Sequence, residues 1–277
     1  MPAIERRARP LLGTFVEIGI RNSSQAVFAQ AFAAMERVHH LMSAHLIASD
    51  LGKIARDAHH GWVPVDPATA EVIRLSLAWA KLTEGAFDPI RAGCELVHAA
   101  RRPCLANHLP DASATWRDLE LEGTKIRTTR PLAIDLGGVA KGYAVDLAAQ
   151  IIDTCGHSGV VNAGGDLRFI GAEQRTISLR KPNTPAARMD LREIPYPALA
   201  TTASYAFSEE GGNLDLVGSN PPTPPISITV FAQNCALADA MTKAVLNLSS
   251  SVAALILRQL ECSALVITAD GEYHELS

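Results

Sequence analysis

Residues 133–144 read Ala133-Ile134-Asp135-Leu136-Gly137-Gly138-Val139-Ala140-Lys141-Gly142-Tyr143-Ala144. A short apolar strand is expected over residues 132–134 and ends in an acid. The glycine pair then lets the backbone turn tightly into a helix. Lys141 lies about one turn inside that helix. The stretch therefore predicts a fold in which strands and helices are joined by tight turns.

The same stretch has the composition of an anion site. Glycines at a helix N-terminus allow a ligand close to the peptide N–H groups, whose partial positive charge suits phosphate, and the nearby Lys141 adds a full charge. The spacing is neither that of a Walker A loop nor G-x-G-x-x-G. On this stretch alone, a turn with a solvated lysine is the better interpretation.

The N-terminal part of the chain combines one strand with two amphipathic helices. Residues 15–20 alternate loosely between apolar and polar side chains, which predicts a strand. Apolar residues then recur at three- and four-residue spacing over residues 25–43, which is typical of a helix. Asp66-Pro67 forms a cap with a first-turn proline, and the second apolar stripe ends at Gly85.

Towards the C-terminus, short strands alternate with helices. Strand-like runs are expected at residues 119–121, 132–134, 160–162, 176–179, 226–231 and 264–268. Helices are expected near residues 138–153, 236–248 and 251–260. Asp270-Gly271 is a tight-turn dipeptide that predicts a terminal hairpin. The pattern indicates an α+β fold with mixed sheets and packed helices, which we expect to form a single compact domain of residues 1–277.

Composition excludes several classes of protein. The chain has 277 residues, 48% of them hydrophobic, which is enough to bury a core. The formal net charge of -4 offers no general field for a polyanion, so nucleic acid is not an expected partner. No apolar run has the length of a membrane helix or signal peptide, so a cytoplasmic location is expected. The five scattered cysteines contain no C-x-x-C pair, which argues against disulfides and zinc.

Four further motifs occur in order along the chain. Leu41-Met42-Ser43 closes the first helix, and Glu84-Gly85-Ala86-Phe87-Asp88-Pro89 follows the second. Asn162-Ala163-Gly164-Gly165-Asp166 follows a strand, and Ala238-Asp239-Ala240 lies near the C-terminal end. Together with the opening stretch, these resemble the ApbE family of FAD:protein FMN transferases. The family pattern runs M-S, G-A-F-D, D-L-G-G-[IV]-A-K-G-[YW]-A, N-x-G-G-D and A-D-A. The resemblance spans about residues 11–248.

The resemblance implies an ApbE-like fold, FAD as substrate, and Mg²⁺. It also implies transfer of FMN to a Ser or Thr hydroxyl of a target protein, with release of AMP. For the hydroxyl to attack the diphosphate of FAD, the negative charge of the diphosphate must be neutralised. Mg²⁺ with oxygen ligands and a lysine are both suited to this task. The implied partner is a flavin-acceptor protein, whose identity does not follow from this chain.

By position, the resemblance also implies site residues. Those assigned to FAD are Met42, Ala86, Phe87, Asp88, Asp135 and Lys141. The cation is assigned to the carbonyl of Gly138 and the carboxylate of Asp239, and the expected catalytic residues are Asp239 and Lys141. Taken singly, Asp88 and Asp135 can also be explained as cap or turn residues and Met42 as a core residue, although these explanations are weaker for the three together.

One departure from the family pattern affects the cation site. Similar sequences usually carry Thr four residues after the helix aspartate, where this chain has Lys243. A lysine at i+4 shares a helix face with Asp239, so its ammonium group could take part of the space and charge role of Mg²⁺. Alternatively, Lys243 extends into solvent while Asp239 binds the metal. Thr242, at i+3, is a second candidate for the hydroxyl ligand.

Other departures affect how flavin is held. The family's H-I-[ID]-D-P-x-T-G segment is replaced at residues 212–219, and its histidine and proline are absent. Its T-S-G-x-Y segment survives as Thr201-Thr202-Ala203-Ser204-Tyr205. In a third segment Ser49 is present, but Ala55 replaces an asparagine.

Three functions are compatible with these observations. The leading hypothesis is a Mg²⁺-dependent FAD:protein FMN transferase. The alternatives are an FAD pyrophosphatase, in which water replaces the acceptor hydroxyl, and a catalytically impaired FAD-binding protein.

Overall fold

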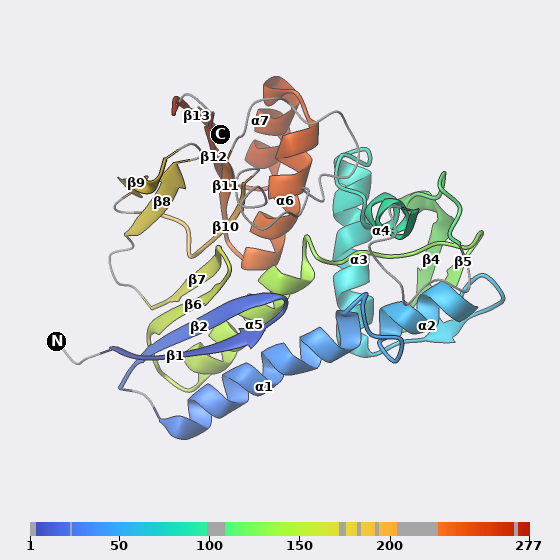
Figure 1. Ribbon diagram of the computed structural model, residues 1–277, viewed down its shortest axis with the longest axis horizontal. Helices are drawn as coiled ribbons and strands as arrows, with labels where there is room; N and C mark the ends of the chain where they lie inside the picture. Colours follow the sequence, from blue (N-terminus) through green and yellow to red (C-terminus); the bar gives the residue numbers. More distant parts are fainter. Residues whose placement is uncertain are drawn as a thin grey trace. The chain divides into compact units, whose positions relative to one another are not determined.

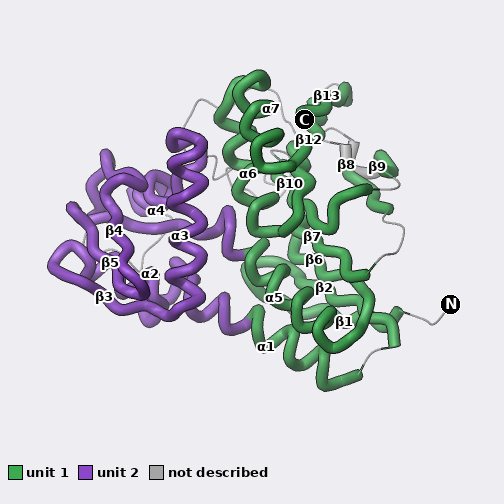
Figure 2. The backbone as a smooth tube through the Cα atoms, turned by 180° about the vertical axis from the view of Figure 1, so that it is seen from behind, with its two compact units in different colours: residues 1–35, 141–214, 220–277 green, residues 36–140, 215–219 purple. Residues whose placement is uncertain are grey.

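The computed structural model describes residues 4–22, 24–98, 109–171, 176–181, 184–191, 194–203, 227–268 and 271–277. The backbone divides into two compact units, coloured separately in Figure 2. The described part of unit 1 lies within residues 4–35, 141–203 and 227–277, and that of unit 2 within residues 36–140. We describe each unit by itself. The single domain expected over residues 1–277 stays a prediction.

Unit 1 is built on an eight-stranded sheet with the order β1-β2-β6-β7-β10-β11-β12-β13. Every neighbouring pair in this sheet is antiparallel. The strands are β1 (Ile4–Leu11), β2 (Thr14–Arg21), β6 (Gly159–Ala163), β7 (Asp166–Ile170), β10 (Ala198–Ala203), β11 (Ser227–Ala232), β12 (Ser263–Ile267) and β13 (Tyr273–Leu276).

One face of this sheet carries small side chains that admit a helix. The helices of unit 1 include α5 (Ala140–Thr154), α6 (Cys235–Asn247) and α7 (Ser250–Gln259), of which α6 packs on β10 and β11 (Figure 1). Successive side chains of a strand point to opposite faces. In β10 this rule puts Ala198, Ala200 and Thr202 on the same face, and Thr202 contacts α6 through Thr242. Small residues here allow close packing of α6.

The opposite face of the sheet is covered by a hairpin. Strands β8 (Ile177–Lys181) and β9 (Thr184–Leu191) form a separate two-stranded sheet. Ile177 and Leu179 of β8 belong to an apolar cluster with Leu199, Phe231 and Leu265 of the main sheet. The main sheet is therefore buried on both faces in this region.

Unit 2 combines helices with a three-stranded sheet of order β3-β5-β4. Helix α1 (Gln25–Met42) starts in unit 1 and continues into unit 2. The remaining elements of unit 2 are α2 (Asp50–Asp57), β3 (Val63–Pro64), α3 (Pro67–Leu82), α4 (Pro89–His98), the 3₁₀ helix η2 (Trp116–Asp118), β4 (Leu119–Glu122) and β5 (Lys125–Thr128).

Most of the predicted elements are confirmed. Helices α1 and α3 match their apolar stripes, and Asp66 caps α3 by accepting from Ala68 N at 2.9 Å. Residues 15–20 lie in β2, and α5, α6 and α7 occupy the three later helical ranges. The terminal hairpin is confirmed by antiparallel pairing of β12 with β13. The α+β fold class is therefore correct.

The strand expected at residues 132–134 is wrong. These residues have no strand assignment and lead directly into the turn before α5. Leu132, Ala133 and Ile134 are buried, and a Cβ on Gly93 of α4 would lie 2.4 Å from the carbonyl oxygen of Ala133. The segment owes its apolar composition to close packing on α4 rather than to strand pairing.

Some expectations fall where the structure gives no description. These are the replaced segment at residues 212–219, Ser204 and Tyr205, the first residue of the strand expected at 226–231, and Asp270 of the terminal turn. Among the helices that the structure describes, none has the length and apolar composition that crossing a bilayer requires.

Candidate active site

Lys141 lies in the first turn of α5, directly after a turn that is stabilised by hydrogen bonds among its own residues. Asp135 Oδ1 accepts a hydrogen bond from Gly137 N at 2.8 Å, and Ala140 N donates to the carbonyl of Leu136 at 2.7 Å. An aspartate that bonds the backbone two residues later is typical of a turn leading into a helix. The turn starts α5 so that Lys141 is its second residue.

Asp166 is placed by a two-residue hairpin between β6 and β7. Gly164 and Gly165 have φ of +65° and +106°, a combination that favours glycine at both positions. A Cβ on Gly164 would lie 2.5 Å from Thr14 Oγ1, so glycine is also required by space. Asn162 Oδ1 accepts from Gly165 N at 3.1 Å. The glycine pair thus fixes Asp166 as the first residue of β7.

Asp239 belongs to α6, whose first turn is held by two capping side chains. Asn234 Oδ1 accepts from Leu237 N at 2.9 Å. Asp146 of α5 accepts from Cys235 N and Ala236 N, both at 2.9 Å, and also pairs with Arg168. A carboxylate at a helix N-terminus is stabilised by the free N–H groups and the helix dipole. Asp146 therefore ties α6 to α5.

The two helices also approach closely at Gly142. A Cβ at this position would lie 2.4 Å from the carbonyl oxygen of Cys235, which is closer than packed atoms come. Glycine here lets α5 and the start of α6 meet. This contact brings the neighbouring residue, Lys141, within reach of α6.

Lys141 joins two buried carboxylates from different elements. Its Nζ lies 2.8 Å from Asp166 Oδ2 and 2.9 Å from Asp239 Oδ2. The carboxylates are 3% and 1% exposed, whereas the lysine side chain is 28% exposed. The segments of three motifs singled out in the sequence therefore meet at one ammonium group.

The charges in this cluster depend on one another. Burial, and then the Asp239 carboxylate, raise the pKa of Asp166 to about 6, although Lys141 opposes both effects. Burial alone raises the pKa of Asp239, but Lys141 and Lys243 outweigh it, so the pKa lies below its ordinary value. For Lys141 burial lowers the pKa, but the two carboxylates outweigh it and raise the pKa. Lys141 therefore stays an ammonium ion.

Lys243 points into the same cluster. Its Nζ lies 3.4 Å from Asp239 Oδ1 and 3.0 Å from Thr242 Oγ1, and it donates to Thr202 Oγ1 of β10. Of the two alternatives for Lys243, the structure has the pair with Asp239 rather than extension into solvent. Each oxygen of the Asp239 carboxylate therefore faces one ammonium group.

Unit 2 contains the remaining predicted residues. Met42 and Phe87 are buried, and the Phe87 ring lies edge-on to Trp79 with centroids 6.5 Å apart. Asp88 caps α4, because its Oδ1 accepts from Ile90 N at 3.0 Å and Arg91 N at 3.2 Å. Its Oδ2 accepts from Trp116 N at 3.2 Å. Both carboxylate oxygens of Asp88 thus accept hydrogen bonds from backbone N–H groups.

Comparison with known proteins identifies the family of the chain. The sequence profile of the ApbE family matches residues 12–266, which is most of the chain.

This chain belongs to the ApbE family.

The curated relatives described below share the name FAD:protein FMN transferase. A protein named FAD:protein FMN transferase from Rhodobacter capsulatus is 28% identical over 200 residues, covering 65% of this chain and 38% of the relative. One with the same name from Vibrio cholerae serotype O1 is 25% identical over 265 residues, covering 86% and 78%. The match thus spans well under half the length of the Rhodobacter protein.

Solved ApbE structures share the fold. A structure described as flavin transferase ApbE from Vibrio cholerae has a TM-score of 0.81 at 21% identity, covering 99% of this chain and 97% of that chain. An ApbE protein from Thermotoga maritima has a TM-score of 0.76 at 24% identity, covering 98% and 96%. The ApbE fold therefore extends over nearly the whole chain.

Within this ApbE chain, unit 1 brings Lys141, Asp239 and Thr242 together with two residues that were not among the predicted site residues. Asp166 belongs to the motif at residues 162–166, and its position directly after the glycine pair is the sequence signal that could identify it. Thr202 lies in the segment where the family's T-S-G-x-Y pattern is altered, but its contact with α6 follows only from the packing of α6 on β10. Met42, Ala86, Phe87, Asp88, Asp135 and Gly138 belong to unit 2.

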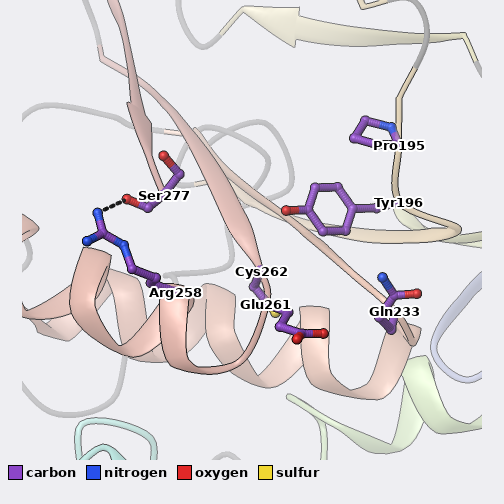
Figure 3. Close-up of a pocket in the computed structure, with 7 residues that line it drawn as sticks. All are labelled: Pro195, Tyr196, Gln233, Arg258, Glu261, Cys262 and Ser277. Carbon is purple, nitrogen blue, oxygen red and sulfur yellow. Dashed lines mark hydrogen bonds between the residues drawn. The ribbon is translucent and has the colours of Figure 1, made fainter.

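A surface depression of about 550 Å³ lies elsewhere in unit 1 (Figure 3). It is lined by Pro195, Tyr196, Gln233, Arg258, Glu261, Cys262 and Ser277. Arg258 donates to the Ser277 carbonyl at 3.0 Å across it. The depression contains none of the predicted site residues of this ApbE chain.

Proposed function

We propose that this chain transfers FMN from FAD to a Ser or Thr hydroxyl of a target protein and releases AMP. The observation that carries the proposal is the convergence on Lys141: Asp166 and Asp239 come from two other family motifs and lie 2.8 and 2.9 Å from its ammonium nitrogen. The name shared by the curated relatives supports the same activity.

The chemistry asks for a fixed positive charge beside a diphosphate. The acceptor oxygen forms a bond to the FMN phosphorus, the phosphoanhydride bond breaks, and its electron pair leaves with AMP, while the hydroxyl proton passes to solvent. A preorganised ammonium stabilises the charge that develops on the phosphate oxygens. We assign this task to Lys141, which is held in position by Asp239 and Asp166.

The FAD site is proposed to include Met42, Ala86, Phe87, Asp88 and Asp135. Asp135 is partly exposed, and Gly137 in the same turn is exposed. Ala86 is also partly exposed, beside the buried Phe87. Asp88 contributes by fixing the turn before α4, because its oxygens are bonded to backbone N–H groups. A target protein and a cytoplasmic location remain parts of this proposal.

The predicted Mg²⁺ site does not fit the arrangement within unit 1. Both oxygens of Asp239 face ammonium groups, and Thr242 Oγ1 is bonded to Lys243, Thr202 and the Asp239 carbonyl. Among the described residues, no group of three or more His, Cys, Asp or Glu side chains converges as metal ligands. Gly138, the third predicted ligand, belongs to unit 2. We therefore derive no step through Mg²⁺, and its assignment stays a prediction.

The first test removes the charge of Lys141. The full-length protein is incubated with FAD and an extract of the source cells, and covalent flavin is detected as fluorescent bands on a denaturing gel, with AMP measured by chromatography. We expect Lys141→Met to lower AMP release by about 100-fold or more. Lys53→Met is the control. It removes an ion-paired lysine of unit 2 and should leave the rate of AMP release unchanged.

The same assay separates the alternative functions. Free FMN accumulating with AMP in the absence of extract would indicate a pyrophosphatase. FAD binding without release of AMP, with or without extract, would indicate a catalytically impaired protein. Equal activity of Lys141→Met and the unaltered chain would contradict the role given to Lys141.

A further inference from the structure

The Lys243 ammonium sits among three oxygens. These are Thr202 Oγ1 from β10 and, from α6, Thr242 Oγ1 at 3.0 Å and Asp239 Oδ1 at 3.4 Å. An ammonium group has three N–H donors and no acceptor, so this set of oxygens matches its donors in number. Thr242 is fully buried, Asp239 is 1% exposed, and the lysine side chain is 32% exposed. The oxygens therefore surround a cation that the chain itself supplies.

The Thr242 hydroxyl has no capacity left for a second cation. Thr242 Oγ1 donates to the Asp239 carbonyl at 2.7 Å, so its contact of 2.8 Å with Thr202 Oγ1 uses the Thr202 proton. Thr242 Oγ1 then accepts from both Thr202 and Lys243, which uses both of its lone pairs. A metal at Thr242 would have to displace one of these bonds.

The charges of the cluster also balance without a metal. Asp166 and Asp239 supply two negative charges, and Lys141 and Lys243 supply two positive charges. A further divalent ion would meet two ammonium groups within a few ångströms and would have to lose much of its hydration. Mg²⁺ requires oxygen ligands at about 2.1 Å, and each Asp239 oxygen already has an ammonium neighbour.

The position of Lys243 is fixed by the fold. It follows Asp239 by one helical turn, and the N-terminal turn of α6 is held by Asp146 and Asn234. Thr202 lies on the face of β10 that contacts α6. The donor set is therefore assembled from two packed elements and does not depend on a loop.

We propose that the Lys243 ammonium is a built-in cation of this site, which takes the place of a divalent metal ion at Asp239 and makes the site independent of metal. The binding part of this proposal stands on the geometry of unit 1 alone. Its consequence for catalysis, that the reaction proceeds in the presence of a chelator, rests on the proposed FMN transfer.

The test measures Mn²⁺ binding to the full-length protein without FAD, by electron paramagnetic resonance and equilibrium dialysis. We expect no Mn²⁺ bound through Asp239 in the unaltered chain. Lys243→Thr removes the ammonium group and leaves oxygen ligands. We expect this variant to gain one Mn²⁺ site, with an affinity for Mn²⁺ at least about 10-fold higher than that of the unaltered chain. Adding Asp239→Asn to this variant should abolish the gain.

Lys53→Thr is the matched control. Lys53 pairs with Oδ1 of the buried Asp50 at 2.8 Å. The other oxygen of that carboxylate already accepts from Thr69 Oγ1 at 2.8 Å and from Asp66 N at 2.9 Å, so removing Lys53 leaves only one oxygen free for a metal. This variant should gain no Mn²⁺ site. Circular dichroism verifies that each variant is folded.

Two results would overturn the proposal. The first is Mn²⁺ bound by the unaltered chain and lost in Asp239→Asn, a readout that does not require any Lys243 variant to fold. The second is a folded Lys243→Thr protein with no gain in Mn²⁺ affinity. If the chain releases no AMP under any condition, the proposed function fails, while the Mn²⁺ result still decides the role of Lys243.

Discussion

At the scale of single residues, several aspartates of this chain accept hydrogen bonds from backbone N–H groups or from ammonium groups. Asp88, Asp135 and Asp146 each accept hydrogen bonds from backbone N–H groups where a helix begins. Ser49 does the same for α2 by accepting from Gly52 N at 3.1 Å, and Ala55, which departs from the family pattern, is buried in that helix. Several polar residues near the motifs are therefore explained by local structure.

Asp50 provides a prediction for stability and its pH dependence. Burial alone would raise its pKa, but hydrogen bonds from Lys53, Asp66 N and Thr69 outweigh it and hold the pKa of Asp50 below its ordinary value. The carboxylate therefore stabilises the fold above about pH 4, the ordinary pKa, and this contribution is lost as the pH falls further. Asp50→Asn should lower the free energy of unfolding by about 1–3 kcal/mol at pH 7.

Urea unfolding at pH 7 and at pH 3 checks this prediction. The difference between the unaltered chain and Asp50→Asn should shrink at the lower pH. Asp57→Asn, in the same helix but 59% exposed, should change stability by less than about 0.5 kcal/mol. A difference that is equal at both pH values would exclude the ionised carboxylate as its cause.

At the scale of elements, the candidate site depends on how α5 and α6 meet. Gly142 allows the close approach, and Asp146 holds the N-terminus of α6. Lys141 is next to Gly142, and Asp239 follows Cys235 by four residues. The distance of 2.9 Å between Lys141 Nζ and Asp239 Oδ2 therefore follows from helix packing. The functional contact is thus a property of two helices rather than of one motif.

This packing predicts a strong effect of Gly142→Ala. The added methyl group would lie 2.4 Å from the Cys235 carbonyl oxygen, so the helices must separate. We expect a loss of about 1–3 kcal/mol in the free energy of unfolding, together with reduced AMP release. Gly61→Ala is the control, because a Cβ at Gly61 meets nothing within 4 Å. Equal stability of the two variants in thermal unfolding would contradict the close contact of α5 with α6.

At the scale of the whole molecule, ligand binding should be visible as a change in stability. A ligand that binds only the folded state at 100 times its Kd adds about 2.7 kcal/mol to the free energy of unfolding. We therefore expect saturating FAD to raise the Tm of the full chain, and Lys141→Met to lose most of this rise. EDTA should leave the Tm unchanged with or without FAD. A fall in Tm on adding EDTA that is seen in the unaltered chain but not in Asp239→Asn would indicate a metal at Asp239 and contradict the built-in cation.

The sequence alone determined the class of the fold, the family and most of the helices. Apolar periodicity and capping residues are local, so α1 and α3 were predictable from neighbouring residues alone. The apolar residues 132–134 show the limit of this reasoning, because packing on α4 and strand pairing require the same composition. Burial is decided by the neighbours of a segment, and these lie far away in the chain.

Only the tertiary structure decided which charges meet. Asp166, Thr202 and Lys243 come from a hairpin, a central strand and a helix, and their contacts depend on strand register and on the packing of α6 against β10. The sequence left Lys243 with two alternatives, since a lysine at i+4 can reach an aspartate or solvent. Thr202, placed opposite by β10, supplies the additional oxygen that holds the ammonium beside Asp239. Electrostatic pairing acts over a few ångströms in space, and only the fold determines that distance for residues far apart in the chain.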